Sequence, residues 1–350
     1  MTGGTTPDED LLIRTQGRVG RLTLNRPKAL NALTYAMALR MEEALRAWQN
    51  DPTVELVLID AAGDKAFCAG GDIRDLYDTG RSGDFEFGRR FWADEYRLNA
   101  LIKTYPKPFV AIMDGITMGG GVGISAHGSL RIVGDRTLLA MPECSIGLIP
   151  DVGGTLILGH APGHIGEYVG LTGARLGPAD AIYAGFADLY VPSGRLEALK
   201  AALVDQATPK AAEAFAEDPA QGELQVNRQA IDAVFSAPHV PDIIASLHRL
   251  EAPWAEKALK GLNAAAPLAL ACGLEAIRAA RSMTSIAEAL AQEYRFVWRA
   301  MEEGEFLEGI RAAVIDKDRT PHWARPTFED LQPADIKAML APLGPNELAL

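Results

Sequence analysis

Three adjacent glycines, Gly119 to Gly121, constrain the fold of this chain more than any other feature. They follow an apolar run, residues 109–113, which fits a buried strand that ends at Asp114 and Gly115. Glycines ahead of small apolar residues let the backbone turn tightly into a helix whose first N–H groups are free. Such a helix N-terminus attracts an anion or a polarised carbonyl oxygen. The sequence therefore predicts an oxyanion-binding turn at this point.

Two carboxylates follow this turn, Glu143 and Asp151, eight residues apart. Each stands directly after a proline, and apolar residues such as Ile146 and Leu148 lie between them, which predicts a partly buried loop. Two carboxylates in one pocket tend to have different pKa values, so that one ionises while the other keeps a proton. The ordinary alternative is a pair of solvated loop acids, since most Asp and Glu side chains are solvated. An oxyanion site with two carboxylates nearby favours acyl chemistry.

The order of apolar runs and glycine turns predicts an α/β fold, because strands that alternate with helices imply right-handed crossovers. Glycine turns after strands, at 70–71 and 119–121, indicate a site at the strand ends. The predicted elements are strand 19–24, a helix capped by Thr34 and ended by Asp51, strand 54–59, loop 63–73, helical residues 74–103 with a break near 80–83, strand 109–113, helix 119–128 and a short strand near 131–133. From about residue 196 to about 340, helical periodicity replaces the strand signals.

Length and composition restrict the domain organisation and the class of partner. A chain of 350 residues can bury a sizeable core, and we expect a polar N-terminal tail at 1–10, a core at 11–200 and a helical region at 201–350. The net charge of −12 argues against binding to nucleic acid or to an anionic membrane. No apolar run approaches the roughly 18 residues of a membrane span. Three cysteines without metal or disulfide spacing, and an acidic N-terminal stretch up to Glu9, predict a cytoplasmic location.

Three separated motifs carry a resemblance to a known family. The segments LNRPKALNAL at 24–33, AFCAGGDI at 66–73 and GGG at 119–121 closely resemble the crotonase (enoyl-CoA hydratase/isomerase) superfamily in order and spacing. The resemblance implies a crotonase-like ββα spiral core that binds acyl-CoA, with an oxyanion hole formed by the backbone N–H groups of Gly71 and Gly120. It also implies coenzyme A contacts at Lys28, Ala29, Lys65, Ala69, Gly70, Asp72 and Ile73. For the two lysines, the ordinary alternative is a solvated surface charge.

Three positions distinguish branches of this superfamily. Gly123 stands where enoyl-CoA hydratases have the first of two glutamates, whereas Glu143 matches the second glutamate. Asp151 stands where hydratases have a glycine. The Glu–Asp pair and two C-terminal segments, 308–312 and 315–318, are similar to the 3-hydroxyisobutyryl-CoA hydrolase family.

That hydrolase family also implies a substrate-contacting glutamate in a Glu-Tyr pair, here Glu95 followed by Tyr96. The substrate-binding residues implied by the resemblance are Glu95, Gly120, Glu143 and Asp151. Because Glu95 lies in a charge-rich helix, an ordinary solvated face is the alternative.

The resemblance implies hydrolysis of a short 3-hydroxyacyl-CoA, 3-hydroxyisobutyryl-CoA, to the free acid and coenzyme A in valine catabolism. We expect Glu143 to attack the thioester carbon or to activate water, and Asp151 to orient the substrate hydroxyl, to position water or to take part in proton transfer. We expect no cofactor and no metal, because coenzyme A is part of the substrate, and we expect a crotonase-like homo-oligomer, a dimer or trimer. The alternatives are a hydratase or isomerase of the same fold and a non-catalytic crotonase-like binding protein.

Overall fold

The computed structural model describes residues 7–350 and, in α1 (Pro7–Asp10), the side chains from Glu9 onward. The chain forms two compact units, each assembled from separated segments. The first unit contains the chain up to Asp72 together with 97–139 and 176–222, and the second contains 73–96, 140–175 and 223–350. The division into a core at 11–200 and a helical region at 201–350 stays a prediction.

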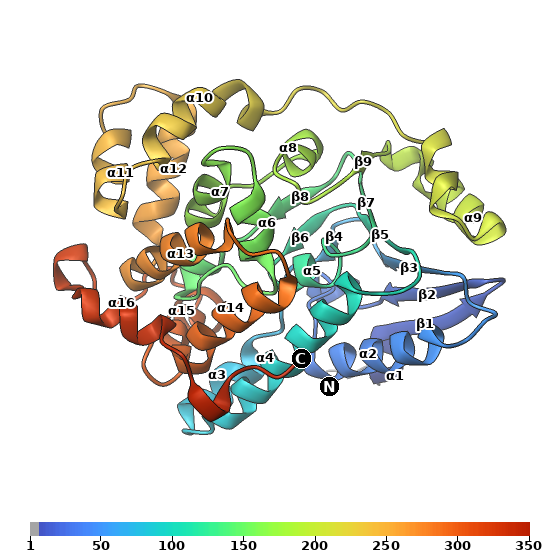
Figure 1. Ribbon diagram of the computed structural model, residues 1–350, viewed down its shortest axis with the longest axis horizontal. Coiled ribbons are helices and arrows are strands. Elements are labelled where there is room, and N and C mark those ends of the chain that lie inside the picture. Colours follow the sequence, from blue (N-terminus) through green and yellow to red (C-terminus); the bar gives the residue numbers. More distant parts are fainter. Residues whose placement is uncertain (1–6) are drawn as a thin grey trace. The chain divides into compact units, whose positions relative to one another are not determined.

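The first unit is built on a six-stranded sheet in the order β1-β2-β3-β5-β7-β9 (Figure 1). Its strands are β1 (Leu11–Gln16), β2 (Val19–Leu24), β3 (Leu56–Ala61), β5 (Phe109–Met113), β7 (Leu130–Val133) and β9 (Leu189–Tyr190). β1 and β2 pair antiparallel, whereas the remaining pairs are parallel. The predicted α/β class and the strands at 19–24 and 109–113 are confirmed.

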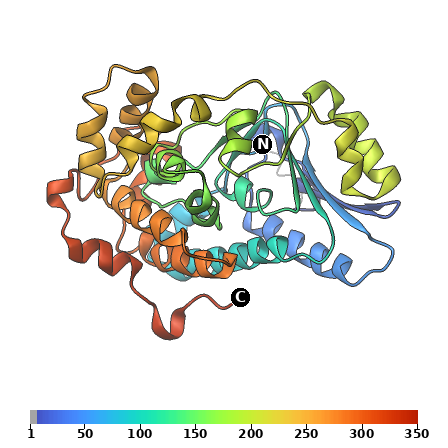
Figure 2. The ribbon, with the colours of Figure 1, turned by 45° about the horizontal axis from the view of Figure 1, so that its top comes forward.

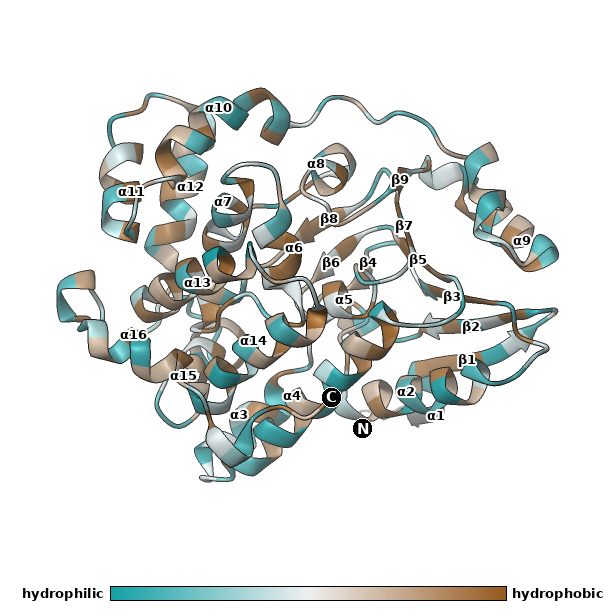
Figure 3. Cartoon of the chain, viewed as in Figure 1, coloured by the Kyte–Doolittle hydropathy of each residue, from teal (hydrophilic) through white to brown (hydrophobic). Residues whose placement is uncertain are grey.

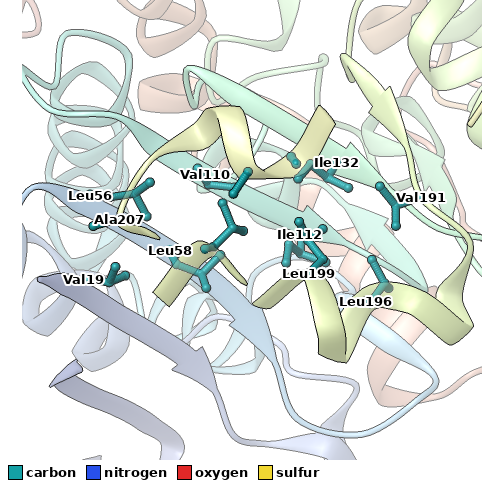
Figure 4. Packing of buried hydrophobic residues seen from close by; sticks show 13 residues of the cluster. Val19, Leu56, Leu58, Val110, Ile112, Ile132, Val191, Leu196, Leu199 and Ala207 are labelled. Carbon is teal, nitrogen blue, oxygen red and sulfur yellow. The ribbon is translucent and has the colours of Figure 1, made fainter. Parts of the chain in front are cut away.

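Helices cover both faces of this sheet. On one face, α9 (Leu196–Gln206) packs Leu196, Leu199 and Leu203 against strand residues such as Leu58 and Ile112 (Figure 4). The central strands are drawn largely in the hydrophobic colour (Figure 3), as expected for parallel strands buried on both faces.

On the other face, α2 (Tyr35–Gln49) brings Trp48 against β2. A Cβ on Gly20 would lie 2.5 Å from the Trp48 ring, so only glycine allows this approach. Side chains alternate along a strand, which places Gly20 opposite Val19 and the α9 face. Thr34 caps α2 as predicted, because its side chain accepts a hydrogen bond from the Met37 N–H over 3.2 Å.

A second, three-stranded sheet has the order β4-β6-β8, with β4 (Ala66–Cys68), β6 (Ile116–Met118) and β8 (Leu138–Ala140). The predicted loop at 63–73 therefore contains a strand. The predicted helix at 119–128 is also too long, because α5 spans only Gly120–Gly123. Glycine is a poor helix former, and the chain continues in turns through residues 124–127.

The second unit is helical. Its helices are α3 (Arg74–Arg81), α4 (Phe85–Lys103, of which 97–103 belong to the first unit), α6 (Gly154–His160), α7 (Ile165–Thr172), α10 (Glu223–Phe235), α11 (Val240–Leu247), α12 (Pro253–Ala264), α13 (Pro267–Ala280), α14 (Ile286–Ala300), α15 (Phe306–Ile310) and α16 (Pro333–Leu340). Both ribbon views place α13 beside α6 and α7 (Figures 1 and 2). The predicted helical character beyond residue 196 is confirmed. Within residues 7–350, no helix is long and apolar enough to cross a membrane.

The remaining elements are short. In the first unit they are η1 (Pro27–Ala29), α8 (Pro178–Tyr183), η3 (Ser193–Arg195) and η4 (Pro209–Ala214), and in the second they are η2 (Glu143–Ile146), η5 (Arg311–Ile315), η6 (Phe328–Asp330) and η7 (Gly344–Asn346).

Candidate active site

In the first unit, the two predicted glycine turns lie side by side because β4 and β6 are parallel neighbours. Gly70 follows β4 at φ +114°, and Gly119 follows β6 at φ +48°, both backbone conformations that glycine adopts at little cost. A Cβ on Gly121 would overlap the Cys68 carbonyl oxygen. Glycine at 121 is therefore required for the close approach of the two turns.

The backbone N–H groups of Gly71 and Gly120 are free to bind an oxygen. The Leu33 N–H donates to the Gly70 carbonyl over 2.9 Å, and the Asp72 N–H donates to the Leu33 carbonyl over 2.8 Å, so these bonds flank the Gly71 N–H without using it. Gly120 is the first residue of α5, where helical N–H groups have no acceptor within the helix. Across the described chain, neither N–H donates to another backbone group.

The structure brings part of the predicted coenzyme A set to this loop. Lys28 and Ala29 lie exposed in η1, and the Ala69 N–H donates to the Leu30 carbonyl just after it over 3.1 Å. Asn31, in the left-handed region at φ +55°, fixes the turn by donating from Nδ2 to the carbonyls of Ala62 and Ala66 over 3.0 and 2.8 Å. The turn at 28–29 is thus bound to the 66–72 segment.

The other predicted coenzyme A residues have separate environments. Lys65 is exposed immediately before β4. The Asp72 carboxylate lies 3.0 Å from an Arg26 guanidinium nitrogen, which gives this side chain a structural partner within the protein. Ile73 directly precedes α3 in the second unit and makes no side-chain capping bond. Their coenzyme A contacts stay predictions.

In the second unit, Glu143 opens η2 and is buried. Neither of its carboxylate oxygens has a hydrogen-bond partner among the described residues. Burial raises the pKa of Glu143 well above its ordinary value, and the nearby charge of Asp151 raises it further. An uncompensated buried carboxylate costs on the order of several kcal/mol, so a protein keeps one where its reactivity is used. The alternative of a solvated loop acid is therefore wrong for Glu143.

Asp151 is also buried, and its Oδ2 accepts a hydrogen bond from the Tyr96 hydroxyl over 2.7 Å. Burial raises the pKa of Asp151, and the Tyr96 hydroxyl bond opposes this rise. The next residue, Val152, has φ +54°, which is rare for a β-branched side chain and costs roughly 1–3 kcal/mol of strain. The turn that carries Asp151 is thus held in an unfavourable conformation.

Glu95 lies in α4 and is only 3% exposed, so the alternative of a solvated helix face is wrong. Burial, followed by the charge of Asp151, raises the pKa of Glu95 to about 8. Glu95 Oε1 has no partner within the described residues. The three predicted carboxylates, Glu95, Glu143 and Asp151, therefore form one buried cluster in which like charges raise the pKa of Glu95 and Glu143.

A fourth carboxylate, Glu293 of α14, was missed by sequence reasoning. It is fully buried; burial raises its pKa, and hydrogen bonds from Thr155 and Gly153 oppose this rise. Its carboxylate accepts hydrogen bonds from the Gly153 N–H over 2.7 Å, from the Thr155 N–H over 3.0 Å and from the Thr155 hydroxyl. The available signal was an acidic residue in an apolar helical stripe, between Leu290 and Val297.

The C-terminal motif at 308–312 supports the loop that carries Glu143. A Cβ on Gly309 of α15 would overlap the Ile146 carbonyl oxygen, so α15 and η2 are in backbone contact. Gly147, at φ +77°, ends η2, and a Cβ there would lie 2.8 Å from the Glu305 carbonyl carbon.

Arg311 then fixes the segment that follows α15. Its guanidinium pairs with Glu308, Asp316 and Asp318, each over 2.7 Å. The segment at 308–312 therefore contacts the loop that carries Glu143, and the segment at 315–318 is bound to Arg311.

The chain is similar to known proteins over nearly all of its length. The family model described as enoyl-CoA hydratase/isomerase matches residues 19–340. The mitochondrial 3-hydroxyisobutyryl-CoA hydrolase of Gallus gallus is 38% identical over 97% of this chain and 91% of its own length. Crystal structures of an enoyl-CoA hydratase from Rhodobacter sphaeroides and a carnitinyl-CoA dehydratase from Mycobacterium thermoresistibile are 50% and 45% identical, each with a TM-score of 0.93. They match 97% of this chain, and 100% and 98% of their own.

The predicted cytoplasmic location is wrong in the light of these relatives, since the Gallus gallus hydrolase is mitochondrial. The prediction relied on the acidic stretch up to Glu9, and the charge of such a stretch does not determine the compartment.

Proposed function

The chain belongs to the enoyl-CoA hydratase/isomerase family, and we propose that it hydrolyses the thioester of 3-hydroxyisobutyryl-CoA to the free acid and coenzyme A. The observation that carries this proposal is the buried Glu143 carboxylate, neither oxygen of which has a partner within residues 9–350, and which lies in one cluster with Asp151. The name of the Gallus gallus relative supports the choice of substrate.

The chemistry follows from charge development at the thioester carbonyl. In the tetrahedral transition state the carbonyl oxygen becomes negative, and the N–H groups of Gly71 and Gly120 stabilise it, each by about 3 kcal/mol. Ionised Glu143 either attacks the carbonyl carbon, forming a mixed anhydride that water then opens, or removes a proton from the attacking water. In both routes the C–S bond breaks, and the sulfur leaves as a thiolate that takes up a proton.

Asp151 supplies selectivity for the acyl group. Its Oδ2 already accepts a bond from Tyr96, and a carboxylate has further acceptor capacity for the 3-hydroxyl group of the substrate. A site built to bind a hydroxyl group rejects the analogue that lacks it, by up to several orders of magnitude. Hydrolysis is therefore expected to favour 3-hydroxyisobutyryl-CoA over isobutyryl-CoA.

A second candidate function is hydration of an enoyl-CoA, because the two similar crystal structures are a hydratase and a dehydratase. The residue at position 123 argues against it. Hydration by a pair of glutamates needs a second proton-transferring side chain, and Gly123 has only a hydrogen there.

One assay separates these functions. Hydrolysis releases a free thiol, whereas hydration of crotonyl-CoA removes enoyl absorbance without releasing coenzyme A. The three cysteines are buried, so they add little background to thiol detection. We expect thiol release from 3-hydroxyisobutyryl-CoA at a kcat/KM at least about tenfold above that for isobutyryl-CoA.

In Asp151→Gly we expect a lower rate and a smaller preference for the hydroxylated substrate. Hydration of crotonyl-CoA without thiol release would favour the hydratase alternative, and no turnover of any thioester would favour the non-catalytic one. Equal hydrolysis of both saturated substrates would reduce the proposal to an acyl-CoA thioesterase. The dimer or trimer stays a proposal that sedimentation of the full chain tests.

A further inference from the structure

Glu293 anchors the turn directly after Asp151. Its two oxygens accept three hydrogen bonds. Oε2 accepts from the Gly153 N–H, and Oε1 accepts from the N–H and the hydroxyl of Thr155. Gly153 and Thr155 bracket the start of α6, so Glu293 binds the N–H groups that a helix leaves free there. Gly153, the N-cap residue of α6, has no side chain that could supply such an acceptor.

The turn needs such an anchor because two consecutive residues in it are left-handed. Val152 has φ +54° and Gly153 has φ +78°. A β-branched residue in this region is strained and remains there only when the surrounding structure fixes it. The turn is closed by a hydrogen bond from the Gly154 N–H to the Asp151 carbonyl over 2.7 Å. The N–H groups of Gly153 and Thr155 donate instead to Glu293.

We propose that Glu293 is a positioning residue that holds the Val152–Gly153 turn so that the Asp151 carboxylate faces the Tyr96 hydroxyl and the substrate. This inference rests on the proposed function, in which Asp151 binds the 3-hydroxyl group of the substrate. It assigns a role in selectivity to α14, whose Glu293 carboxylate need not touch the substrate.

The groups near Glu293 are acidic or phenolic. Asp151 and Glu143 interact with it electrostatically, as does Tyr96. No Lys or Arg forms an ion pair with Glu293 within residues 9–350. The three hydrogen bonds oppose the effect of burial on the pKa of Glu293, and their full set requires both oxygens as acceptors.

Glu293→Gln is the direct test. It keeps the volume of the side chain, but it replaces one carboxylate oxygen, which accepts a hydrogen bond, by an NH2 group that faces the same donor. We expect kcat/KM for 3-hydroxyisobutyryl-CoA to fall by roughly tenfold or more, and that for isobutyryl-CoA to fall by less than about threefold. The ratio of kcat/KM for the hydroxylated substrate to that for isobutyryl-CoA should therefore be smaller than in the wild type and closer to the ratio in Asp151→Asn. Thr155→Val removes one of the three donors at constant shape, and should shift the preference in the same direction by a smaller factor.

The matched control is Glu167→Gln in α7. Glu167 is equally buried, but it pairs with Arg278 and Arg281, so its loss should lower thermal stability and leave the substrate preference unchanged. Glu293→Gln with reduced stability and an unchanged preference would make Glu293 a purely structural residue and overturn the proposal. If Glu293→Gln does not fold, Thr155→Val decides by the same criterion.

A double-mutant cycle separates this inference from the proposed function. Asp151→Asn and Glu293→Gln are combined, and kcat/KM is measured on whichever acyl-CoA the wild type turns over. The two residues are coupled if kcat/KM of the double variant is at least about fivefold higher than the product of the two single effects predicts. This criterion holds even if the wild type does not discriminate the hydroxyl group and the substrate assignment fails. Fully multiplicative effects overturn the positioning role, whatever the substrate is.

Discussion

The Tyr96 hydroxyl donates a hydrogen bond to Asp151 Oδ2 over 2.7 Å, with both side chains buried. The bond stabilises the ionised form of Asp151, and so it lowers a pKa that burial raises. The Tyr96 ring is held in place by an edge contact with Tyr294, whose ring centroid lies 6.1 Å away. Orientation and ionisation of Asp151 therefore both depend on one phenol.

Tyr96→Phe should lower hydrolysis of 3-hydroxyisobutyryl-CoA by about tenfold to a hundredfold, because a hydrogen bond to a charged group contributes roughly 1.5–3 kcal/mol. Loss of the bond also raises the pKa of Asp151, so the pH–rate profile should move to higher pH. The measurement is kcat/KM from about pH 6 to 9 in both proteins. An unchanged profile would show that Tyr96 only fills space.

Glu143→Gln should abolish hydrolysis while binding of coenzyme A remains. The amide keeps the volume of the side chain but is neither a base nor a useful nucleophile. Loss of general-base catalysis alone lowers the rate by ~10²–10⁴-fold. Thiol release and calorimetric binding of coenzyme A measure the two properties separately. A variant that retains more than about a tenth of the wild-type rate would exclude Glu143 from the reaction.

Buried Glu95 should make the folded state less stable as pH rises. Burial raises the pKa of Glu95 to about 8 in the folded state, above its ordinary value of 4.5. Between these values the folded chain holds more protons at this group than the unfolded chain, so the free energy of unfolding falls with rising pH by about 1.4 kcal/mol per pH unit.

Urea unfolding at pH 5.5, 6.5 and 7.5 measures this slope. In Glu95→Gln the slope should be smaller by the contribution of one group, because the amide does not titrate. Equal slopes in the wild type and the variant would contradict the raised pKa of Glu95.

Gly309→Ala should lower both stability and activity. Its methyl group would overlap the Ile146 carbonyl, so α15 or the loop that carries Glu143 must move, at a cost of about 1–3 kcal/mol. The control is Gly177→Ala, since no atom lies within 4 Å of a Cβ at Gly177. Thermal melting and thiol release are compared in both variants. A fully active Gly309→Ala would show that the contact does not position Glu143.

Much of the fold followed from local patterns. The apolar run before Asp114 and the Thr34 cap are short-range signals, and the structure has a strand and a helix there. The helix expected at 119–128 failed because the glycines that create the turn also shorten the helix that follows. The strand at 66–68 was missed because three residues are too few to show alternation.

For the candidate site, the types of residue and their order could be predicted from the sequence: Glu143 and Asp151 on one loop, glycines after two strands, and a missing acid at Gly123. These features could be predicted because turns, helix caps and family motifs each depend on residues that are close together in the chain. The cytoplasmic location was wrong, since the acidic stretch near Glu9 does not determine the compartment.

Which side chains are buried together depends on the folding of the whole chain. The contact between Gly309 and Ile146 and the anchoring of Thr155 by Glu293 join residues more than a hundred positions apart, and local patterns do not specify such pairs. Burial likewise depends on every element packed around a residue, and it turned Glu95 from an ordinary helix acid into a carboxyl with a pKa of about 8. Desolvation acts in three dimensions, so the protonation of this site is a property of the packed fold.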